Sequence, residues 1–400
     1  MSTFAPTWEL RINGKRFPSG LKPMVREVRV EATTDGADEL VIEADAYDSV
    51  GRQYRIGGQD VLGPGNSVVV RMGYVDGGGV SALQRFRIVR EEPHYPAAGH
   101  PWVRFVGYSA EHRLVEVTKA RTYPSSISDS EIVRELAEEV GLRTTADSLR
   151  ATPSRTGRSR IKPKGTTDWS FLQSLAALND YGPPTVRYSE ALDADVLYFR
   201  PTALADQPDR FRFLYDVRTD RTAEVGHLRS FDAQISIAGV PTSVRVTGWD
   251  PATQAAVTVE VELTGDAQGR VIYEGAAPKN VTAPRSGSGL QVEVLSTAPD
   301  VGEGSKDERL YVGTVDTTES AASFARRWIA TRNRAYATAR ATVTGDPRIW
   351  IGQVHTFDGL APAHTGLWEV VRAVHRMQTG SGYVVDLDLV RVLEETPEER

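Results

Sequence analysis

The chain has 400 residues, 40% of them hydrophobic and 25% charged, with a formal net charge of −6. This composition is typical of a globular protein of about two to four domains, and the mild charge excludes a strongly basic nucleic-acid-binding protein. The absence of cysteine excludes disulfides and cysteine-ligated metal centres. The N-terminus shows no signal peptide, and no apolar run reaches the ~20 residues of a spanning helix. We therefore expect synthesis in the cytoplasm and no membrane insertion.

Apolar and polar residues alternate along residues 1–115, and turn residues such as Gly63-Pro64-Gly65-Asn66 separate the alternating stretches. Short strands at this spacing favour an antiparallel barrel or sandwich. The sequence therefore predicts a first β-barrel domain over residues 1–115. Its strands are expected at residues 25–31, 40–46, 67–74, 85–90 and 102–108.

The period then changes to that of a helix. Ser128 precedes Glu131 by three residues, which is the spacing of a capping box, and Gly141 is placed to close the helix in a left-handed turn. The apolar face expected to be buried contains Ile132, Val133, Leu136, Ala137 and Val140.

A second helix is predicted after Thr167, a plausible N-cap, and before Gly182-Pro183-Pro184. Short strands are expected at residues 185–188 and 196–199. We therefore expect a small α+β domain over residues 116–205, inserted between strand-rich regions. The buried face of this second helix is expected to contain Trp169, Leu172, Leu175 and Ala176.

Strand patterns return after this insertion. Residues 206–264 are expected to form the first part of a second barrel, and residues 265–315 a loop-rich insertion or small subdomain. Residues 316–395 are expected to complete the second barrel and to include a helix at residues 317–336, before a disordered acidic tail at residues 396–400. The strands expected here are residues 233–237, 243–248, 257–263, 339–344, 353–357, 367–376 and 382–392.

Two segments share a pattern. The stretch from Phe86 to Arg90 is followed by a strand that starts at Trp102, and the stretch from Trp368 to Arg372 is followed by a strand that starts at Tyr383. Each pair follows a glycine turn and a strand. The pattern fits either a duplicated barrel or two unrelated β-hairpins. The fold class expected is mainly β, with two antiparallel β-barrels and an inserted α+β domain.

The sequence contains no recognised catalytic or metal-binding motif. It has no G-x-S-x-G nucleophile elbow, no phosphate-binding P-loop and no HExxH spacing. His94 and His100 could approach across one hairpin, but we interpret them as loop residues because no carboxylate pattern completes a ligand set. We predict no catalytic, cofactor or metal residues. The histidines are His94, His100, His112, His227, His355, His364 and His375.

The charged residues allow two interpretations. The acids Glu138, Glu139, Asp45 and Asp48 could belong to a hydrolase, but nothing singles out a pair, so we interpret them as solvated. A basic cluster without acids could contact nucleic acid or an acidic protein surface, or could be a solvated flexible loop before a helix, which we favour. The cluster consists of Arg150, Arg155, Arg158, Arg160, Lys162 and Lys164.

Three runs carry a family resemblance: ISDSEIVRELAEEVGLRTT, KGTTDWSFLQSLAALNDYGPPTVRY with the strand DVLYFRP, and the C-terminal run from SAASFARRW through GDPRIWIGQVHTFDG to GYVVDLDLVR. They resemble the late control D family of phage tail proteins, the baseplate hub proteins of contractile tails, which are related to the base of the type VI secretion spike. The resemblance is strongest at residues 126–200 and 316–392 and weak at residues 265–312.

The resemblance implies a homotrimer in which each chain contributes two barrels similar to the tail-tube subunit. Three chains would form a pseudo-hexameric ring that joins the six-fold tail tube to the three-fold spike and encloses a channel. The implied partners are the tail tube or tube-initiator protein, the central spike protein, the baseplate wedge proteins and the tape measure protein. DNA would pass without sequence-specific binding, and the protein would be a component of the virion tail baseplate or a related injection particle.

Two other functions stay open from the sequence. A tail-associated hydrolase of peptidoglycan or polysaccharide would need an acidic pair in a cleft. A receptor-binding β-protein would need aromatic-rich loops, whereas this chain ends in a plain hairpin and an acidic tail.

Overall fold

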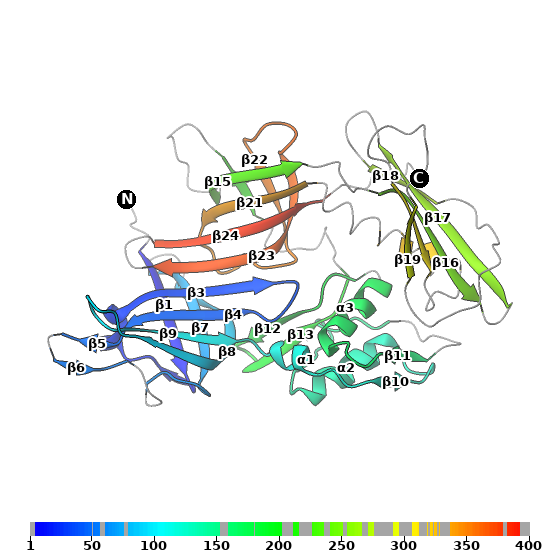
Figure 1. The fold of residues 1–400 in the computed structure, drawn as a ribbon. Helices are drawn as coiled ribbons and strands as arrows, with labels where there is room; N and C mark the ends of the chain where they lie inside the picture. The colour runs from blue at the N-terminus through cyan, green and yellow to red at the C-terminus, as the bar shows by residue number, and fades with distance from the viewer. Residues whose placement is uncertain are drawn as a thin grey trace.

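The computed structural model shows a mostly β chain with one group of helices at the side of a large sheet (Figure 1). No helix among the described residues is long and apolar enough to cross a membrane. The structure describes residues 5–49, 51–56, 61–75, 79–152, 159–179, 181–201, 211–215, 226–235, 241–250, 254–265, 271–275, 291–295, 306–311, six residues between 318 and 328, 337–378 and 382–392.

The large sheet has 13 strands, and its first half comes from the N-terminal region. Alternating apolar side chains such as Val28, Val30 and Phe105 point into one core, while charged residues occupy the other face. This alternation is the reason that these segments form half-buried strands. The strands, in spatial order, are β2 (Lys15–Arg16), β1 (Pro6–Ile12), β7 (Ser67–Tyr74), β8 (Gly79–His94), β9 (Trp102–Tyr108), β4 (Glu39–Asp45) and β3 (Val25–Thr33).

The second half of the sheet closes on itself. Its strands are neighbours in the order β23-β22-β14-β15-β21-β24, and β24 also pairs with β23, so that the pairings form a ring. The strands are β14 (Arg212–Leu214), β15 (Gly226–Ile235), β21 (Ala337–Thr344), β22 (Val354–Asp358), β23 (Gly366–Gln378) and β24 (Gly382–Arg391).

The two halves are joined by strands that lie far apart in the sequence. β3 pairs antiparallel with β23, from Glu27 opposite Gln378 to Thr33 opposite Arg372. The strands therefore stack without a break from β15 to β8 in Figure 1. Both halves share one core, in which Val28 and Val30 are buried together with Trp368 and Met377.

The two halves repeat one strand order and one register. The order β7-β8-β9-β4-β3 corresponds to β22-β23-β24-β21-β15. Ser67 lies opposite Arg87, as Val354 lies opposite Glu369. Asp45 lies opposite Trp102, and its counterpart Thr344 lies opposite Val384, so Trp102 corresponds to Val384. The aromatic residues in the sequence had aligned Trp102 with Tyr383, which is one residue away.

The irregular positions repeat as well. A bulge interrupts the β8–β9 pairing between Ile88 and Arg90, and another interrupts the β23–β24 pairing between Val370 and Arg372. Likewise, β3 has a bulge after its first pair with β4, and β15 has a bulge after Leu228. Bulges re-aim the side chains that follow, so matched bulges indicate matched strand paths and not merely matched strand counts.

A glycine with positive φ precedes the first strand of each matched order, β7 and β22, and bonds to the second strand. Gly65 (φ 92°) donates its N–H to the carbonyl of Ile88 at 2.7 Å, and Gly352 (φ 74°) donates to the carbonyl of Val370 at 2.8 Å. A positive φ favours glycine because a Cβ atom would be strained there. The glycine turns noted in the sequence thus have the same geometry in both halves.

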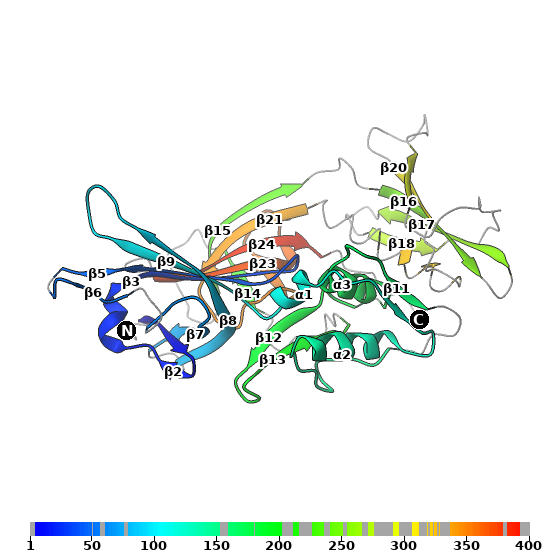
Figure 2. The ribbon, with the colours of Figure 1, turned by 60° about the horizontal axis from the view of Figure 1, so that its bottom comes forward.

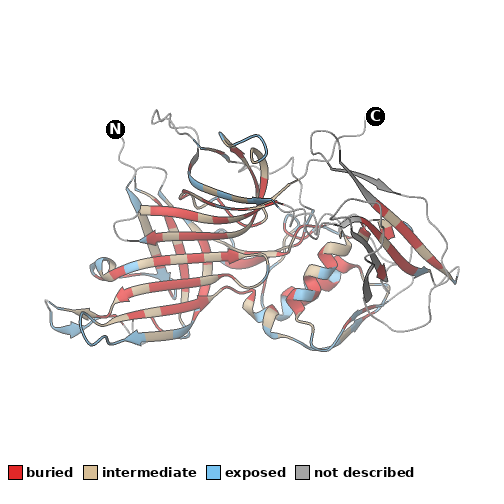
Figure 3. Ribbon diagram, turned by 45° about the horizontal axis from the view of Figure 1, so that its top comes forward, coloured by how far each residue is buried: buried red, intermediate tan, exposed pale blue. Residues whose placement is uncertain are grey.

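The inserted helices have the predicted caps. The Ser128 side chain accepts from the Glu131 N–H in a complete capping box, Gly141 has φ 74°, and Thr167 caps the second helix by accepting from Ser170. Apart from half-buried Val140, the predicted apolar faces are buried, as the red faces of the helices in Figure 3 show. The elements are α1 (His112–Glu116), β10 (Arg121–Tyr123), α2 (Asp129–Glu139), β11 (Arg160–Lys162), α3 (Asp168–Leu178), β12 (Thr185–Ser189) and β13 (Ala194–Tyr198).

The domain assignment predicted for residues 206–315 is partly wrong, because strands from this region form a separate five-stranded sheet. Residues 243–248 and 257–263 form strands as predicted, but these strands belong to this sheet and not to the second half of the large one. They pair with strands from the segment expected to be loop-rich, because the pairing partners are set by long-range contacts that local patterns do not contain. The strands, in spatial order, are β18 (Val271–Gly275), β17 (Ala255–Gly265), β16 (Pro241–Asp250), β20 (Lys306–Tyr311) and β19 (Gln291–Leu295).

Part of the helix predicted at residues 317–336 is described. Ala321 and Ala325 are helical and buried against Val244 and Leu310 of the five-stranded sheet, with Trp328 at its margin. The other residues of that prediction, apart from helical Thr318, Ala322 and Phe324, lie outside the described residues. The remaining small elements are η1 (Ser19–Met24), β5 (Tyr47–Asp48) and β6 (Gln53–Tyr54).

Candidate functional site

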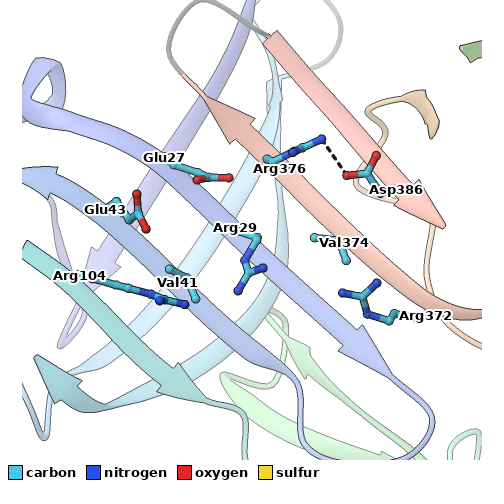
Figure 4. A pocket seen from close by; sticks show the side chains of 9 residues that line it. All are labelled: Glu27, Arg29, Val41, Glu43, Arg104, Arg372, Val374, Arg376 and Asp386. Carbon is cyan, nitrogen blue, oxygen red and sulfur yellow. Dashed lines mark ion pairs between the residues drawn. The ribbon is translucent and has the colours of Figure 1, made fainter. Parts of the chain in front are cut away.

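A charged face covers the side of the large sheet that points away from the core. It extends over β9, β4, β3, β23 and β24 and is hollowed by a shallow depression of about 380 Å³ where the two halves meet (Figure 4). Strand alternation produces this face, because every second residue of these strands points away from the core. The depression is lined by Glu27, Arg29, Val41, Glu43, Arg104, Arg372, Val374, Arg376 and Asp386.

Arginine–carboxylate pairs cross from strand to strand on this face. Arg372 of β23 donates through Nε to Glu31 of β3 at 2.7 Å and through Nη1 to Asp388 of β24 at 3.3 Å. Arg376 pairs with Asp386 at 2.9 Å, as the dashed line in Figure 4 shows. The Arg372–Glu31 pair connects the two halves of the sheet directly. The hydrogen bond to Glu31 raises the pKa of Arg372 and keeps it charged.

The face is polar at its surface and apolar beneath. Val41 and Val374 point to the same side as the arginines but are almost fully buried, at 2% and 5% exposed. Long arginine side chains can cover apolar surface in this way while their guanidinium groups stay in water. The arrangement offers paired charges of both signs on a partly solvent-exposed surface.

The buried carboxyl groups with raised pKa values lie elsewhere, at the joint between the sheet and the helical domain. Burial raises the pKa of Asp38 to about 7, and burial followed by the charge of Asp38 raises the pKa of Glu111 well above its ordinary value. Glu111 accepts from the Val186 N–H at 3.0 Å and from the Ser109 hydroxyl. Both side chains are buried from solvent, so they contribute to the contact between the sheet and the helical domain and do not line a substrate cleft.

Two residues of β8 bind this joint to the helical domain. Gln84 is fully buried and reaches the backbone of β12, and Arg85 forms three hydrogen bonds to Asp195 of β13, at 3.1, 3.2 and 2.9 Å. On the other side, the Arg187 guanidinium lies over the Trp350 ring at 4.2 Å. The helical domain is thus attached to both halves of the large sheet.

The prediction of a solvated basic loop is wrong for two of its residues. Arg160 and Lys162 lie on β11 and are buried, where Arg160 binds Asp129 at 2.9 Å and Lys162 pairs with Asp168. They fit neither a solvated loop nor a surface that contacts nucleic acid, because their charges are neutralised inside the domain. Arg150 and Lys164 are exposed, and Arg155 and Arg158 lie outside the described residues.

The histidines do not gather into a site. His94 and His100 are exposed, as expected, and His94 stacks on Trp102 with ring centroids 3.9 Å apart. His375 is fully buried between Tyr383 and the Ile349 carbonyl, and burial lowers its pKa to about 4, while His355 is buried and accepts from the Phe211 N–H. No cluster of metal-ligating side chains occurs among the described residues. The remaining histidines are His112, paired with Glu116, His364, and His227, whose side chain is not described.

The acids singled out in the sequence are spread over the molecule. Glu139 pairs with Arg121 at 2.5 Å, Asp45 with Arg26 at 2.5 Å and Asp48 with Arg55 at 3.3 Å, and Glu138 is exposed. The structure does not bring any two of them together as a catalytic pair. The charged face was missed in the sequence, although alternating charges such as Glu27, Arg29 and Glu31 were a visible signal for it.

No protein-family model and no curated protein matches the sequence of this chain. Solved structures match its fold over nearly the whole length. A tail protein from Neisseria meningitidis MC58 matches with 12% identity and a TM-score of 0.62, covering 97% of each chain. The 43 kDa tail protein of prophage MuSo2 from Shewanella oneidensis matches with 11% identity and a TM-score of 0.62, covering 97% of this chain and 98% of that one.

A third similar structure is the E. coli c3393 protein, a type VI secretion component with structural similarity to the T4 tail proteins gp27 and gp5. It matches with 10% identity and a TM-score of 0.53, covering 96% of this chain and 77% of its own. At these identities the similarity shows a shared fold. The chain has the fold of phage tail proteins and of a type VI secretion component.

Proposed function

We propose that this protein is a structural hub of a phage tail or a related contractile injection particle, and a member of the late control D family. The observation that carries the proposal is the repeat of one strand order and register within the large sheet. Similarity of fold to two tail proteins over 97% of the chain supports the same function.

The internal repeat would allow three chains to match both a six-fold and a three-fold partner. A six-fold tube presents six equivalent surfaces, and a three-fold spike presents three. Three copies of a chain with two matched halves offer six similar units in a closed ring of three subunits. We therefore propose a homotrimer with two tail-tube-like barrels per chain, the helical domain of residues 116–205 being inserted between them.

The charged face is proposed to line the channel of this ring. Its arginines and carboxylates neutralise one another in pairs such as Arg29–Glu39 and Arg376–Asp386. A wall with balanced charge holds no net field that would retain a polyanion. DNA or protein cargo would pass along it without base-specific contacts.

The proposed partners follow from the two ends of such a ring. One end would bind the tail tube or a tube-initiator protein, and the other the central spike protein. Baseplate wedge proteins and the tape measure protein are further proposed partners. The protein would be a component of the virion tail baseplate, and the proposal assigns it no catalytic role.

Light scattering and electron-microscope class averages of the purified chain test this function. A trimeric mass with six peripheral lobes around a central hole would support both the ring and the duplication. A monomeric mass at all concentrations would contradict the homotrimer. Clearing of cell walls or polysaccharide by the purified chain would favour a tail-associated hydrolase instead.

A further inference from the structure

Asp38 and Glu111 are buried where the helical domain meets the large sheet, with one carboxyl group from each side. Asp38 lies in the turn that precedes β4, and Glu111 directly precedes α1. At this joint, β12 of the helical domain contacts β8 of the sheet (Figure 2). Asp38 is 0% exposed and Glu111 is 2% exposed, and neither forms an ion pair with a described residue. Because an unpaired carboxylate is far more costly to bury than a carboxylic acid, the closed joint favours the protonated form of both groups.

Hydrogen bonds connect the two carboxyl groups to both parts of the molecule. The Ser109 hydroxyl accepts from the Asp38 N–H at 3.0 Å and donates to the Glu111 carboxyl group. Gln84 of β8 donates to the Asp38 carboxyl group at 3.1 Å and also to the Val186 carbonyl of β12. Glu111 in turn accepts from the Val186 N–H at 3.0 Å. The contact that Gln84 makes between β8 and β12 therefore shares one buried network with both carboxyl groups.

The helical domain has a hydrophobic core of its own. Leu136, Leu172 and Leu197 are buried in that core, whereas Val28 and Phe105 belong to the core of the large sheet. A part of a chain with a separate core can stay folded when its contact with a neighbouring part opens. The helical domain is therefore able to move as a unit.

Two further ion pairs cross the joint. Glu190 lies 3.5 Å from Arg71, and its exposed position allows water to replace this partner at small cost. Asp195, which Arg85 binds across the joint, also lies 3.8 Å from Arg113 of the helical domain. Opening the joint would thus leave neither Glu190 nor Asp195 as an unpaired buried carboxylate.

We propose that proton release from Asp38 and Glu111 detaches the helical domain from the large sheet, while both parts stay folded. When the two groups ionise in the closed joint, their negative charges repel each other at a site that is closed to water. In the open joint, water solvates both carboxylates. This conformational change is independent of the proposed ring and goes beyond a purely structural function.

The attachment of the helical domain should weaken as the pH rises. Burial raises the pKa of Asp38 to about 7, and burial followed by the Asp38 charge raises the pKa of Glu111. The charge of Arg187 on β12 lowers the pKa of Asp38, and the charge of Glu31 on β3 raises it. Solvation in the open joint returns both pKa values to about 4. The attachment is therefore strongest below about pH 4 and is lost as the pH rises through about 7 and, for Glu111, beyond. Other charged groups on the surrounding elements have their own partners: Arg85 and Arg113 pair with Asp195, His112 with Glu116, and Glu39 with Arg29.

Hydrogen exchange tests the opening, because Gln84 holds the Tyr188 N–H across the joint at 2.9 Å. After correction for the intrinsic exchange rate, we expect the protection of the Tyr188 amide to fall about tenfold per pH unit for each proton released, between about pH 5 and pH 7. The Leu136 amide in α2 should keep its protection over this range. Constant protection at Tyr188 would overturn the proposal. A parallel loss at Leu136 would overturn it as well, since the helical domain would then unfold and not detach.

A double variant tests which groups release the protons. Asp38→Asn combined with Glu111→Gln removes both titrations and should make the protection of the Tyr188 amide independent of pH. The matched control is Asp147→Asn, which removes an exposed carboxyl group of the helical domain and should leave the pH dependence unchanged. A double variant that keeps the pH dependence of this control would overturn the assignment to Asp38 and Glu111.

A distance measurement keeps both carboxyl groups in place. Because the chain has no cysteine, spin labels at Lys15→Cys on the sheet and Glu138→Cys on α2, both exposed positions, report the separation of the two parts. We expect a broader distribution of label distances at pH 8 than at pH 5. The same distribution at both pH values would overturn the proposed detachment.

Discussion

The side chain of Gln84 forms two hydrogen bonds to the backbone of β12, at Val186 and Tyr188. Its Nε2 donates to the Val186 carbonyl at 2.7 Å, and its Oε1 accepts from the Tyr188 N–H at 2.9 Å. One side-chain amide thus bonds to β12 as a backbone peptide group would, and links β8 of the large sheet to the helical domain. Gln84 is fully buried, so water does not compete for these bonds.

Replacing Gln84 should therefore loosen the joint. Gln84→Met has a similar volume but leaves the Val186 carbonyl and the Tyr188 N–H without this partner. Each buried polar group left unsatisfied costs about 1–3 kcal/mol. We expect the amide of Tyr188 to lose hydrogen-exchange protection by a corresponding factor. Exposed Gln378→Met is the control and should leave this amide unchanged; equal protection in both variants would argue against a strand-like role for Gln84.

The stability of the protein should fall as the pH rises through neutrality. Burial raises the folded-state pKa of Asp38 to about 7, so the folded protein binds this proton more tightly than the unfolded chain does. The stabilisation is complete below the unfolded pKa, near 4, and is lost as the pH rises toward 7. Burial and the Asp38 charge raise the pKa of Glu111 and extend the loss to higher pH.

Melting temperatures between pH 5 and pH 8 measure this effect. We expect the wild-type chain to lose thermal stability relative to Asp38→Asn over this range, because asparagine cannot ionise. Glu111→Gln should flatten the profile further toward the alkaline side. Parallel pH profiles for the wild-type chain and both variants would show that the two carboxyl groups do not titrate in the folded state as expected.

Lys162 should be far more important for stability than its neighbour Lys164. Lys162 is fully buried, pairs with Asp168 and donates to the Lys119 carbonyl at 2.9 Å. Lys162→Met would leave a buried carboxylate without this partner, at a cost of about 3–5 kcal/mol. Lys164 is exposed, and Lys164→Met should change stability by less than about 0.5 kcal/mol. Thermal unfolding that is equally affected by the two changes would refute the buried pair.

Gly345 should not tolerate a side chain. A Cβ atom at Gly345 would lie 2.2 Å from the ring of buried Tyr383, and the Gly345 carbonyl accepts from the Tyr74 hydroxyl at 3.0 Å. Overpacking of this kind costs about 1–3 kcal/mol. We expect Gly345→Ala to lower the melting temperature. The control Gly36→Ala, with open space around its Cβ position, should be close to wild type, and comparable losses in both would contradict the proposed clash.

Local features of the sequence were enough for the inserted helices and most strands. The hydroxyls of Ser128 and Thr167 each accept from a backbone N–H three residues away, so the caps can be recognised without any distant contact. Short apolar stretches between turn residues likewise predicted strands such as β7 and β9 at their observed bounds, and most residues of both strands are buried.

Only the tertiary structure decided which strands pair and which charges are buried. β16 and β17 have the same local pattern as strands of the large sheet, yet they pair with β20 and β18, since pairing depends on the spatial neighbours of a strand. Arg160 and Lys162 are indistinguishable in sequence from solvated residues until Asp129 and Asp168 are placed beside them. The pairing of β3 with β23 unites residues more than three hundred positions apart. Local propensity could not encode that contact, because it reflects only residues that are near one another in the sequence.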